Sequence, residues 1–197
     1  MTGTFRFNEE DHSYWIGERR IPSVTGILRD AGLLNYHGSA DYYMERGTFV
    51  HRATEMIDKG TLDWDSLDST LRPYCEAYQK FINDVKPSII LSEKPLYHAG
   101  YGFAGTPDRA IRINERTSVI DFSTGNPPPA KKIQVAAYQE LIHASEDIFT
   151  SQGFTLWLKD DGSYRLSPPM DTKEMKRQFN FFLAALTVVR WKEESRV

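Results

Sequence analysis

Two short stretches near the middle of the chain decide the fold: Gly105-Thr106-Pro107-Asp108 and Ile120-Asp121-Phe122-Ser123-Thr124-Gly125. A hairpin turn at Asn114-Glu115 between them would place Asp108 opposite Asp121 on adjacent strands, whereas a longer loop over Asn114–Thr117 would shift the register but keep the two strands adjacent. Because side chains alternate along a strand, Asp121 and Ser123 share one face. Two carboxylates held this close are unfavourable unless a proton or a cation compensates them, and hard oxygen ligands suit Mg²⁺ or Mn²⁺. The spacing therefore predicts a divalent-metal site.

The segments around these stretches alternate between two hydrophobic periods, one typical of helices and one typical of strands. We expect helices over residues 22–28, 40–59, 71–85, 131–144 and 172–192. We expect a hairpin over residues 5–22 and strands over residues 89–91, 96–98, 102–113, 118–122, 154–158 and 164–166. This order predicts an α/β fold in which a central mixed, largely antiparallel sheet is flanked by helices.

The size of the chain, 197 residues, predicts a single domain. Within it we expect an N-terminal hairpin and short helix at residues 1–39, a core at 40–170 that contains both stretches, and a C-terminal helix at 171–197. The start of the chain lacks the layout of a signal peptide, and no apolar run reaches the roughly 18 residues of a membrane helix. We therefore expect a cytoplasmic protein without a membrane partner.

Charge and cysteine content restrict the chemistry further. The formal net charge of −3 argues against a protein that coats nucleic acid through bulk positive potential. A single cysteine, Cys75, excludes an internal disulfide and also a four-cysteine iron–sulfur cluster.

Two of the predicted helices carry polar side chains that can face the same site. Lys131, Gln134 and Tyr138 recur at spacings of three and four, so they line one stripe of a helix. His51 and Glu55 lie four residues apart on one helical face, which lets both reach one metal ion or one substrate. Taken singly, each has an ordinary alternative, as a hydrogen-bonded helix residue or a residue at the border of the core.

In order and spacing, these residues resemble the RecB-type branch of the PD-(D/E)XK nuclease superfamily. Its members carry a helix with G-x-x-x-H-x-x-x-E, a strand glutamate, a G-x-x-D strand, a D-x-K strand followed by T-G, and a helix with Q-x-x-x-Y. The chain supplies, in the same order, Gly47, His51, Glu55, Glu93, Gly105, Asp108, Asp121, Thr124, Gly125, Gln134 and Tyr138. The segment Pro22-Ser23-Val24-Thr25 also resembles phage-type members.

The resemblance implies a restriction-endonuclease-like core and hydrolysis of DNA phosphodiester bonds with two Mg²⁺ or Mn²⁺ ions. Because RecB-type members usually process ends, it favours an exonuclease that acts on DNA ends, with a recombination or replication protein as a further partner. The implied metal ligands are His51, Asp108, Asp121 and the backbone carbonyl of Phe122, with Glu93 and Glu55 as additional candidates. Gln134 and Tyr138 would orient the active site or hold the DNA backbone. Glu93 alone also fits a solvated strand residue.

Position 123 departs from the family pattern, because members carry lysine where this chain has Ser123. An ammonium group there steers the attacking water and offsets charge that develops on the phosphate, and losing one such group costs about 10²–10³ in rate. Three explanations stay open. The serine is an introduced replacement that traps DNA with metal, or Lys131 or Lys132 supplies the ammonium from the next helix, or the chain is a naturally inactive DNA-binding relative.

The N-terminal third mixes aromatic and basic side chains, a blend that suits base stacking and contacts with the phosphate backbone. The candidate DNA-binding residues are Trp15, Arg19, Arg20, Tyr42, Tyr43 and Arg46, together with Ser23 and Thr25 from the phage-like segment. A rival interpretation of the whole chain is a non-catalytic module that binds DNA ends or a partner, and Ser123 is its best support. A phosphodiesterase for small nucleotides is less favoured, since the chain lacks a glycine-rich phosphate cradle.

Overall fold

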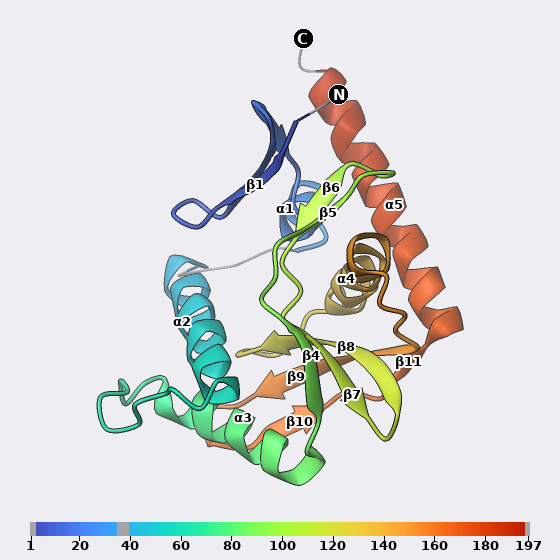
Figure 1. Cartoon of the computed structure of the whole chain (residues 1–197). Helices are drawn as coiled ribbons and strands as arrows, with labels where there is room; N and C mark the ends of the chain where they lie inside the picture. Colours follow the sequence, from blue (N-terminus) through green and yellow to red (C-terminus); the bar gives the residue numbers. More distant parts are fainter. Residues whose placement is uncertain (1–2, 35–39, 196–197) are drawn as a thin grey trace.

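The computed structural model describes residues 3–34 and 40–195, without the side chains of residues 40–45. Figure 1 shows a central sheet with helices on both of its faces and a smaller N-terminal sheet above it. The helices are α1 (Val24–Asp30), α2 (Ala40–Asp58), α3 (Arg72–Val85), α4 (Lys131–Glu146) and α5 (Thr172–Glu194). The strands are β1 (Phe5–Asn8), β2 (Ser13–Ile16), β3 (Arg19–Ile21), β4 (Ser88–Ser92), β5 (Leu96–His98), β6 (Phe103–Gly105), β7 (Arg109–Ile113), β8 (Arg116–Ser123), β9 (Gln152–Leu158), β10 (Tyr164–Leu166) and β11 (Met170–Asp171).

The central sheet has the order β10-β9-β8-β7-β4, with β11 paired to β9. Strands β8 and β9 run parallel, and the other pairs are antiparallel. The predicted hairpin between β7 and β8 is confirmed, since Ile113 pairs with Arg116 and both turn residues, Asn114 and Glu115, have positive φ. A two-residue turn of this kind matches the right-handed twist of the flanking strands. The mixed, mostly antiparallel sheet flanked by helices is the fold that the sequence predicts.

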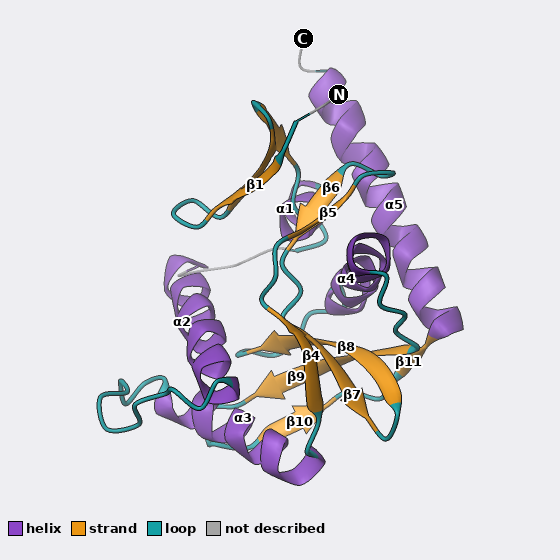
Figure 2. Ribbon diagram, viewed as in Figure 1, coloured by secondary structure: helices purple, strands orange, loops and turns teal. Residues whose placement is uncertain are grey.

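Two apolar cores cover the two faces of this sheet, because successive residues of β8 point to opposite sides. Val119 packs with α1, α4 and α5 in one core, where Leu141 and Phe182 are fully buried. Ile120 and Phe122 pack on the other face with side chains of α3, among them Tyr78. Figure 2 shows α2 and α3 on one side of the sheet and α4 and α5 on the other. The strand end that carries Asp121 therefore lies between two helical layers.

The N-terminal strands β1, β2 and β3 form a separate antiparallel sheet. Its buried residues Tyr14 and Ile21 pack against Ala104 of β6, with Tyr97 of β5 at the border. The sheet leads directly into α1, whose first turn is capped by the Ser23 hydroxyl, which accepts a hydrogen bond from the Gly26 N–H at 3.0 Å. The N-terminal hairpin is thus held against the segment that leads to Asp108.

The structure corrects two strand predictions. Residues 102–113 do not form one strand, because the chain leaves the strand conformation between Gly105 and Arg109, where Pro107 has no N–H to donate to a ladder. Consequently β6 pairs with β5 in a two-stranded sheet of its own, and residues 96–98 do not join the central sheet. This break leaves Asp108 at the very start of β7.

None of the helices in the described ranges combines the length and the apolar character that a bilayer crossing requires. The division of the chain into a single domain with three parts stays a prediction.

Candidate metal centre and active site

Asp108 and Asp121 meet at the end of the β7–β8 hairpin. Arg109 pairs with Ile120, so the next residues in the same register, Asp108 and Asp121, lie across from each other as the spacing predicts. Both residues are almost completely buried, with relative exposures of 3% for Asp108 and 1% for Asp121. Burial of two carboxylates in one place requires compensating cations or hydrogen-bond donors.

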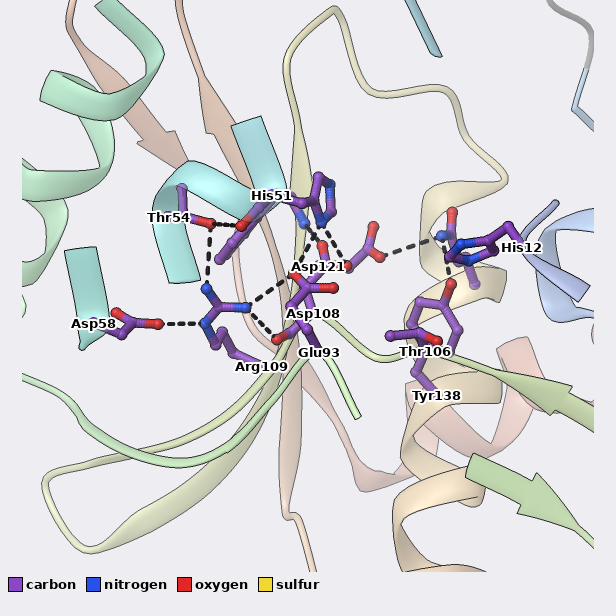
Figure 3. Close-up of polar contacts among 12 residues, drawn as sticks. His12, His51, Thr54, Asp58, Glu93, Thr106, Asp108, Arg109, Asp121 and Tyr138 are labelled. Atoms are coloured by element: carbon purple, nitrogen blue, oxygen red, sulfur yellow. Dashed lines mark hydrogen bonds and ion pairs between the residues drawn. The ribbon is translucent and has the colours of Figure 1, made fainter. Parts of the chain in front are cut away.

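On the α2 side, His51, Glu93 and Asp108 converge. The Nδ1 atom of His51 lies 3.1 Å from Oε1 of Glu93 and 3.2 Å from Oδ1 of Asp108. One ligand atom from each of the three residues falls within 4.8 Å of the others. Figure 3 shows the ring of His51, on α2, directed at the carboxylates of Glu93 and Asp108. An imidazole and two carboxylates at this separation can bind one divalent cation.

Glu93 reaches this group through an unusual backbone conformation. It follows β4 with a φ of 44°, a left-handed value that is uncommon for a residue other than glycine. Its N–H donates to the carbonyl of Asp108 at 3.0 Å, which ties the turn to the start of β7. Such conformations persist where surrounding contacts enforce them, and they are concentrated at functional sites.

Arg109 also holds Glu93 in place, and it is not among the site residues predicted from the sequence. The side chain is 1% exposed, and its guanidinium group donates to Glu93 at 2.9 Å, Asp58 at 2.6 Å and Thr54 at 3.2 Å. It also donates to the backbone carbonyl of Asp108 at 2.6 Å. One signal was present, because an arginine inside an apolar strand requires acidic partners, and Thr54 and Asp58 follow His51 at helical spacing.

The pKa values on this side follow from the ion pairs. Burial lowers the pKa of His51, but the charges of Asp108 and Glu93 outweigh it and raise the value to about 10. Burial acts to raise the pKa of Asp108, whereas His51 and the Phe122 N–H, which donates to Oδ2 at 2.5 Å, bring it below the usual value. Without a metal ion, a protonated His51 therefore balances the carboxylates.

On the α4 side, Asp121 faces Lys131 and Gln134. The Lys131 ammonium contacts Oδ2 of Asp121, and the Gln134 amide donates to Oδ1 at 3.2 Å. Gln134 also donates to the Tyr138 hydroxyl at 3.2 Å, which joins the predicted helical stripe into one network. Burial raises the pKa of Asp121 to about 7, although Lys131 acts to lower it. Burial, together with the two aspartates, also raises the pKa of Tyr138 well above 10.

Ser123 turns away from this network. Its hydroxyl donates to the carbonyl of Gly125 at 2.9 Å and brings no charge to the site. Lys131, in contrast, is 15% exposed at its side chain and reaches Asp121 from the first turn of α4, whereas Lys132 is exposed. Of the two lysines considered from the sequence, Lys131 is the one that the fold brings to the carboxylates.

Glu55 does not join the metal-binding group. Its carboxylate accepts a hydrogen bond from Lys59 at 2.8 Å, on the turn that follows it in α2. The α2 residues that contact the site are instead His51, Thr54 and Asp58, at successive steps of three and four residues.

The predicted DNA-binding residues are only partly gathered near the site. Arg46 donates to the carbonyl of Thr124 at 3.1 Å and lies 4.9 Å from the centre of the Tyr74 ring, so it borders the Asp121 strand end. Arg19 and Arg20 are exposed on β3, Thr25 lies in α1 beside its cap Ser23, and Trp15 donates to Ser13. Tyr42 and Tyr43 belong to α2, but their side chains lie outside the described residues.

One further histidine lies beside the site. His12, at the turn between β1 and β2, has a φ of 50° and a ring nitrogen 3.2 Å from the Tyr14 hydroxyl. Tyr14 in turn contacts the Thr106 hydroxyl at 2.8 Å, within the segment that precedes Asp108. Figure 3 shows His12 and Tyr138 on the opposite side of the aspartates from Arg109. The sequence offered no spacing that would have identified His12.

Comparison with solved structures finds similar proteins at low sequence identity. A protein from Eubacterium rectale that carries an assignment as an exonuclease has a TM-score of 0.52 and 9% sequence identity, over 87% of this chain and 74% of that chain. An alkaline exonuclease from Laribacter hongkongensis gives a TM-score of 0.40 at 12% identity, covering 88% of this chain and 92% of its own. The same enzyme in complex with dAMP gives 0.40 at 15% identity, covering 89% and 93%.

Neither a family model nor a curated protein matches the sequence. The likeness to the Eubacterium rectale protein is therefore a likeness of fold, and it identifies the chain as a restriction-endonuclease-like α/β structure. A shared fold does not by itself indicate a shared activity, which depends on the residues of the site.

Proposed function

We propose that the chain is a metal-dependent nuclease that hydrolyses DNA phosphodiester bonds, and that it acts in the cytoplasm as an exonuclease on DNA ends. The observation that carries this proposal is the convergence of His51, Glu93 and Asp108 within 4.8 Å, next to a buried Asp121 with its own lysine. The exonuclease assignment of the Eubacterium rectale structure adds support through its fold. A RecB-type, phage-like origin and a recombination or replication partner belong to the same proposal.

The residues present fit a divalent cation. Ligand atoms of His51, Glu93 and Asp108 lie within 4.8 Å of one another, close enough to bind one ion. The raised pKa of His51 reflects excess negative charge that a cation would neutralise. His51, Glu93, Asp108, Asp121 and the Phe122 carbonyl would hold Mg²⁺ or Mn²⁺, with two ions as the proposed number. A cation bound there would polarise a phosphate oxygen and make water a stronger nucleophile near neutral pH.

Lys131 takes the part of the family lysine in this proposal. Its ammonium contacts Asp121 from α4, so it can offset charge on a phosphate although position 123 carries no charge. Gln134 orients Asp121 through its amide and is itself oriented by Tyr138. In this proposal, Lys131 on the next helix supplies the ammonium group, so position 123 does not need a lysine.

The DNA backbone is proposed to approach along the N-terminal sheet and the start of α2. The contacts assigned to it are Arg19, Arg20, Ser23, Thr25, Tyr43 and Arg46. Arg46 has the most direct support, because it already borders the strand end of Asp121 through Thr124.

The test measures cleavage of end-labelled linear single-stranded and double-stranded DNA with Mg²⁺ or Mn²⁺. Lys131→Ala is expected to lose about 10²–10³ in rate, the usual effect of removing one preorganised charge. The matched control Lys132→Ala, one residue along the same helix, should stay within about twofold of the parent, as exposed surface changes generally do. Ser123→Lys in the Lys131→Ala background should recover most of the lost rate.

Other outcomes separate the explanations for Ser123. If the parent chain is inactive and Ser123→Lys alone creates activity, the serine is a disabling replacement and Lys131 is not the substitute. If neither protein cuts either substrate with either metal, the nuclease proposal fails.

A second candidate is a non-catalytic module that binds DNA ends or a partner protein. The uncharged Ser123, bonded to Gly125, favours it, because the family position then contributes nothing to the chemistry. DNA binding in the presence of Mn²⁺, without cleavage even after Ser123→Lys, would establish this function.

A further inference from the structure

A stripe of exposed apolar side chains runs along the outer face of α5. Phe181 is 49% exposed, Val188 is 44% exposed and Trp191 is 65% exposed, and the exposed Ala184 lies between them. The inner face of the same helix is already buried, with Phe182, Leu186 and Val189 in the core on α4. Figure 1 shows α5 along the edge of the molecule, so this outer face is directed away from the sheet. Clustered exposed apolar residues of this kind mark interaction surfaces.

The spacing of the α5 stripe, which we define as Phe181, Ala184, Val188 and Trp191, points to a helix as its partner. Its steps of three, four and three residues are those of the a and d positions of a two-stranded coiled coil. A bilayer or a flat surface would need a wider apolar face, whereas this stripe is one residue wide and bordered by polar side chains such as Asn180 and Thr187.

The stripe is also complementary to itself when reversed. Its spacing is symmetric about residue 186, so an antiparallel second copy places Phe181 opposite Trp191 of that copy and Ala184 opposite its Val188. Large residues then meet at both ends and smaller ones in the middle, where two helices must approach closely. The interface would be isologous, as in the commonest homodimers.

The charges beside the stripe select the antiparallel arrangement. The start of α5 exposes Lys173, Lys176 and Arg177, and the end exposes Glu194 on the same flank as Lys176. Near that end, Lys192 is directed back onto the carbonyl of Asp30 at 2.8 Å, which leaves the acidic residue to face a partner. Antiparallel packing brings Lys176 of one copy beside Glu194 of the other, whereas parallel packing would bring like charges together.

We propose that the α5 stripe pairs two copies of this chain into an antiparallel homodimer. This inference is independent of the proposed nuclease activity, since no residue of the metal centre takes part. A stripe of four residues buries less than the about 1,600 Å² of a standard interface, so the affinity is expected in the micromolar range.

The test is sedimentation equilibrium of the full chain over roughly 1–100 µM, which brackets that affinity. The parent chain should be dimeric at the upper end, and Trp191→Glu should be monomeric throughout. Phe149→Glu is the matched control, because Phe149 is 71% exposed but lies on the loop after α4, and it should dimerise as the parent does. Circular dichroism of each variant checks that the fold is retained.

The orientation has a separate test. Lys176→Glu and Glu194→Lys should each weaken the dimer several-fold, and the double variant should recover the parent dissociation constant. A parent chain that stays monomeric, a Trp191→Glu variant that dimerises normally, or an equal loss in Phe149→Glu would overturn the proposal. Failure of the double variant to recover would overturn the antiparallel arrangement.

Discussion

The α2 side and the α4 side of the candidate metal centre place neighbouring aspartates in opposite electrostatic situations. On the α2 side, Asp108 contacts His51 and receives the Phe122 N–H, and its pKa lies below the ordinary value. On the α4 side, burial outweighs the Lys131 contact and raises the pKa of Asp121 to about 7. The difference indicates that the contacts on the α2 side keep Asp108 ionised at neutral pH. On the α4 side, Asp121 is close to the pH at which it becomes protonated.

The largest effect that separates the two sides is expected from the aspartates themselves. Asp108→Asn removes a charged group from the His51 and Glu93 cluster, so cleavage should fall by more than about 10³ and Mn²⁺ affinity by more than the roughly 100-fold typical of outer-shell changes. Asp121→Asn should abolish cleavage similarly but weaken Mn²⁺ less, because its oxygens face Lys131 and Gln134. Calorimetric titration with Mn²⁺ measures the metal affinity of both variants, and cleavage of end-labelled DNA measures their activity.

Equal losses of Mn²⁺ affinity in the two variants would contradict this distinction. Asp65→Asn, a change of the same kind in an exposed loop, provides the control and should match the parent.

The pH dependence of metal binding should also differ between the sides. His51 has a pKa raised to about 10, so it is protonated over the neutral range and must lose that proton to act as a ligand. Mn²⁺ affinity should therefore increase with pH, by up to about tenfold per unit for one released proton, over the range below pH 10. Below about pH 7, Asp121 adds a second proton to the balance.

This dependence can be assigned by comparing the parent with His51→Gln in buffers of different ionisation enthalpy. Between pH 7.5 and 9 the variant should bind Mn²⁺ weakly and release no proton. A slope that persists unchanged in His51→Gln would show that another group is the source.

A buried arginine stabilises the α2 side, and its removal should have an intermediate effect. Arg109→Lys keeps the charge but loses the planar fork that reaches Asp58, Thr54 and Glu93 together. We expect Mn²⁺ affinity to fall about 10-fold to 100-fold, the range for groups that orient metal ligands. Arg112→Lys, on the same strand but exposed, should leave the affinity unchanged. If Arg109→Lys binds Mn²⁺ with unaltered affinity, Arg109 does not orient the metal ligands and contributes only to the stability of the fold.

The parts of the site that could be predicted from the sequence are those set by local geometry. The turn at Asn114-Glu115 fixes the register of β7 and β8, so the opposition of Asp108 and Asp121 followed from counting residues. The stripe of Lys131, Gln134 and Tyr138 likewise needed only the helical period.

The remaining features depend on contacts between distant segments. Arg109 bonds Asp58, which lies 51 positions away, and the left-handed turn at Glu93 is tied by a hydrogen bond to the carbonyl of Asp108. No local pattern distinguishes Glu55 from His51 as a candidate metal ligand, because the packing of α2 against the sheet places His51 beside Glu93 and Asp108, whereas Glu55 contacts Lys59.

The smallest expected effect concerns how closely each helix approaches the sheet. A Cβ at Gly105 would lie 2.9 Å from the Tyr138 ring and 3.0 Å from Leu141, both on α4. Gly105→Ala should thus push α4 outward and destabilise the fold by about 1–3 kcal/mol, the usual effect of overpacking. A Cβ at Gly47 of α2 meets nothing within 4 Å, so Gly47→Ala should stabilise the protein by up to about 1 kcal/mol through helix propensity.

Urea unfolding followed by circular dichroism compares the two variants. Because Tyr138 bonds Gln134, which in turn bonds Asp121, the Gly105→Ala displacement should also reduce cleavage, while Gly47→Ala should not. If Gly105→Ala changes neither the stability nor the cleavage rate, the close packing at Gly105 does not position Tyr138 and Gln134 beside Asp121.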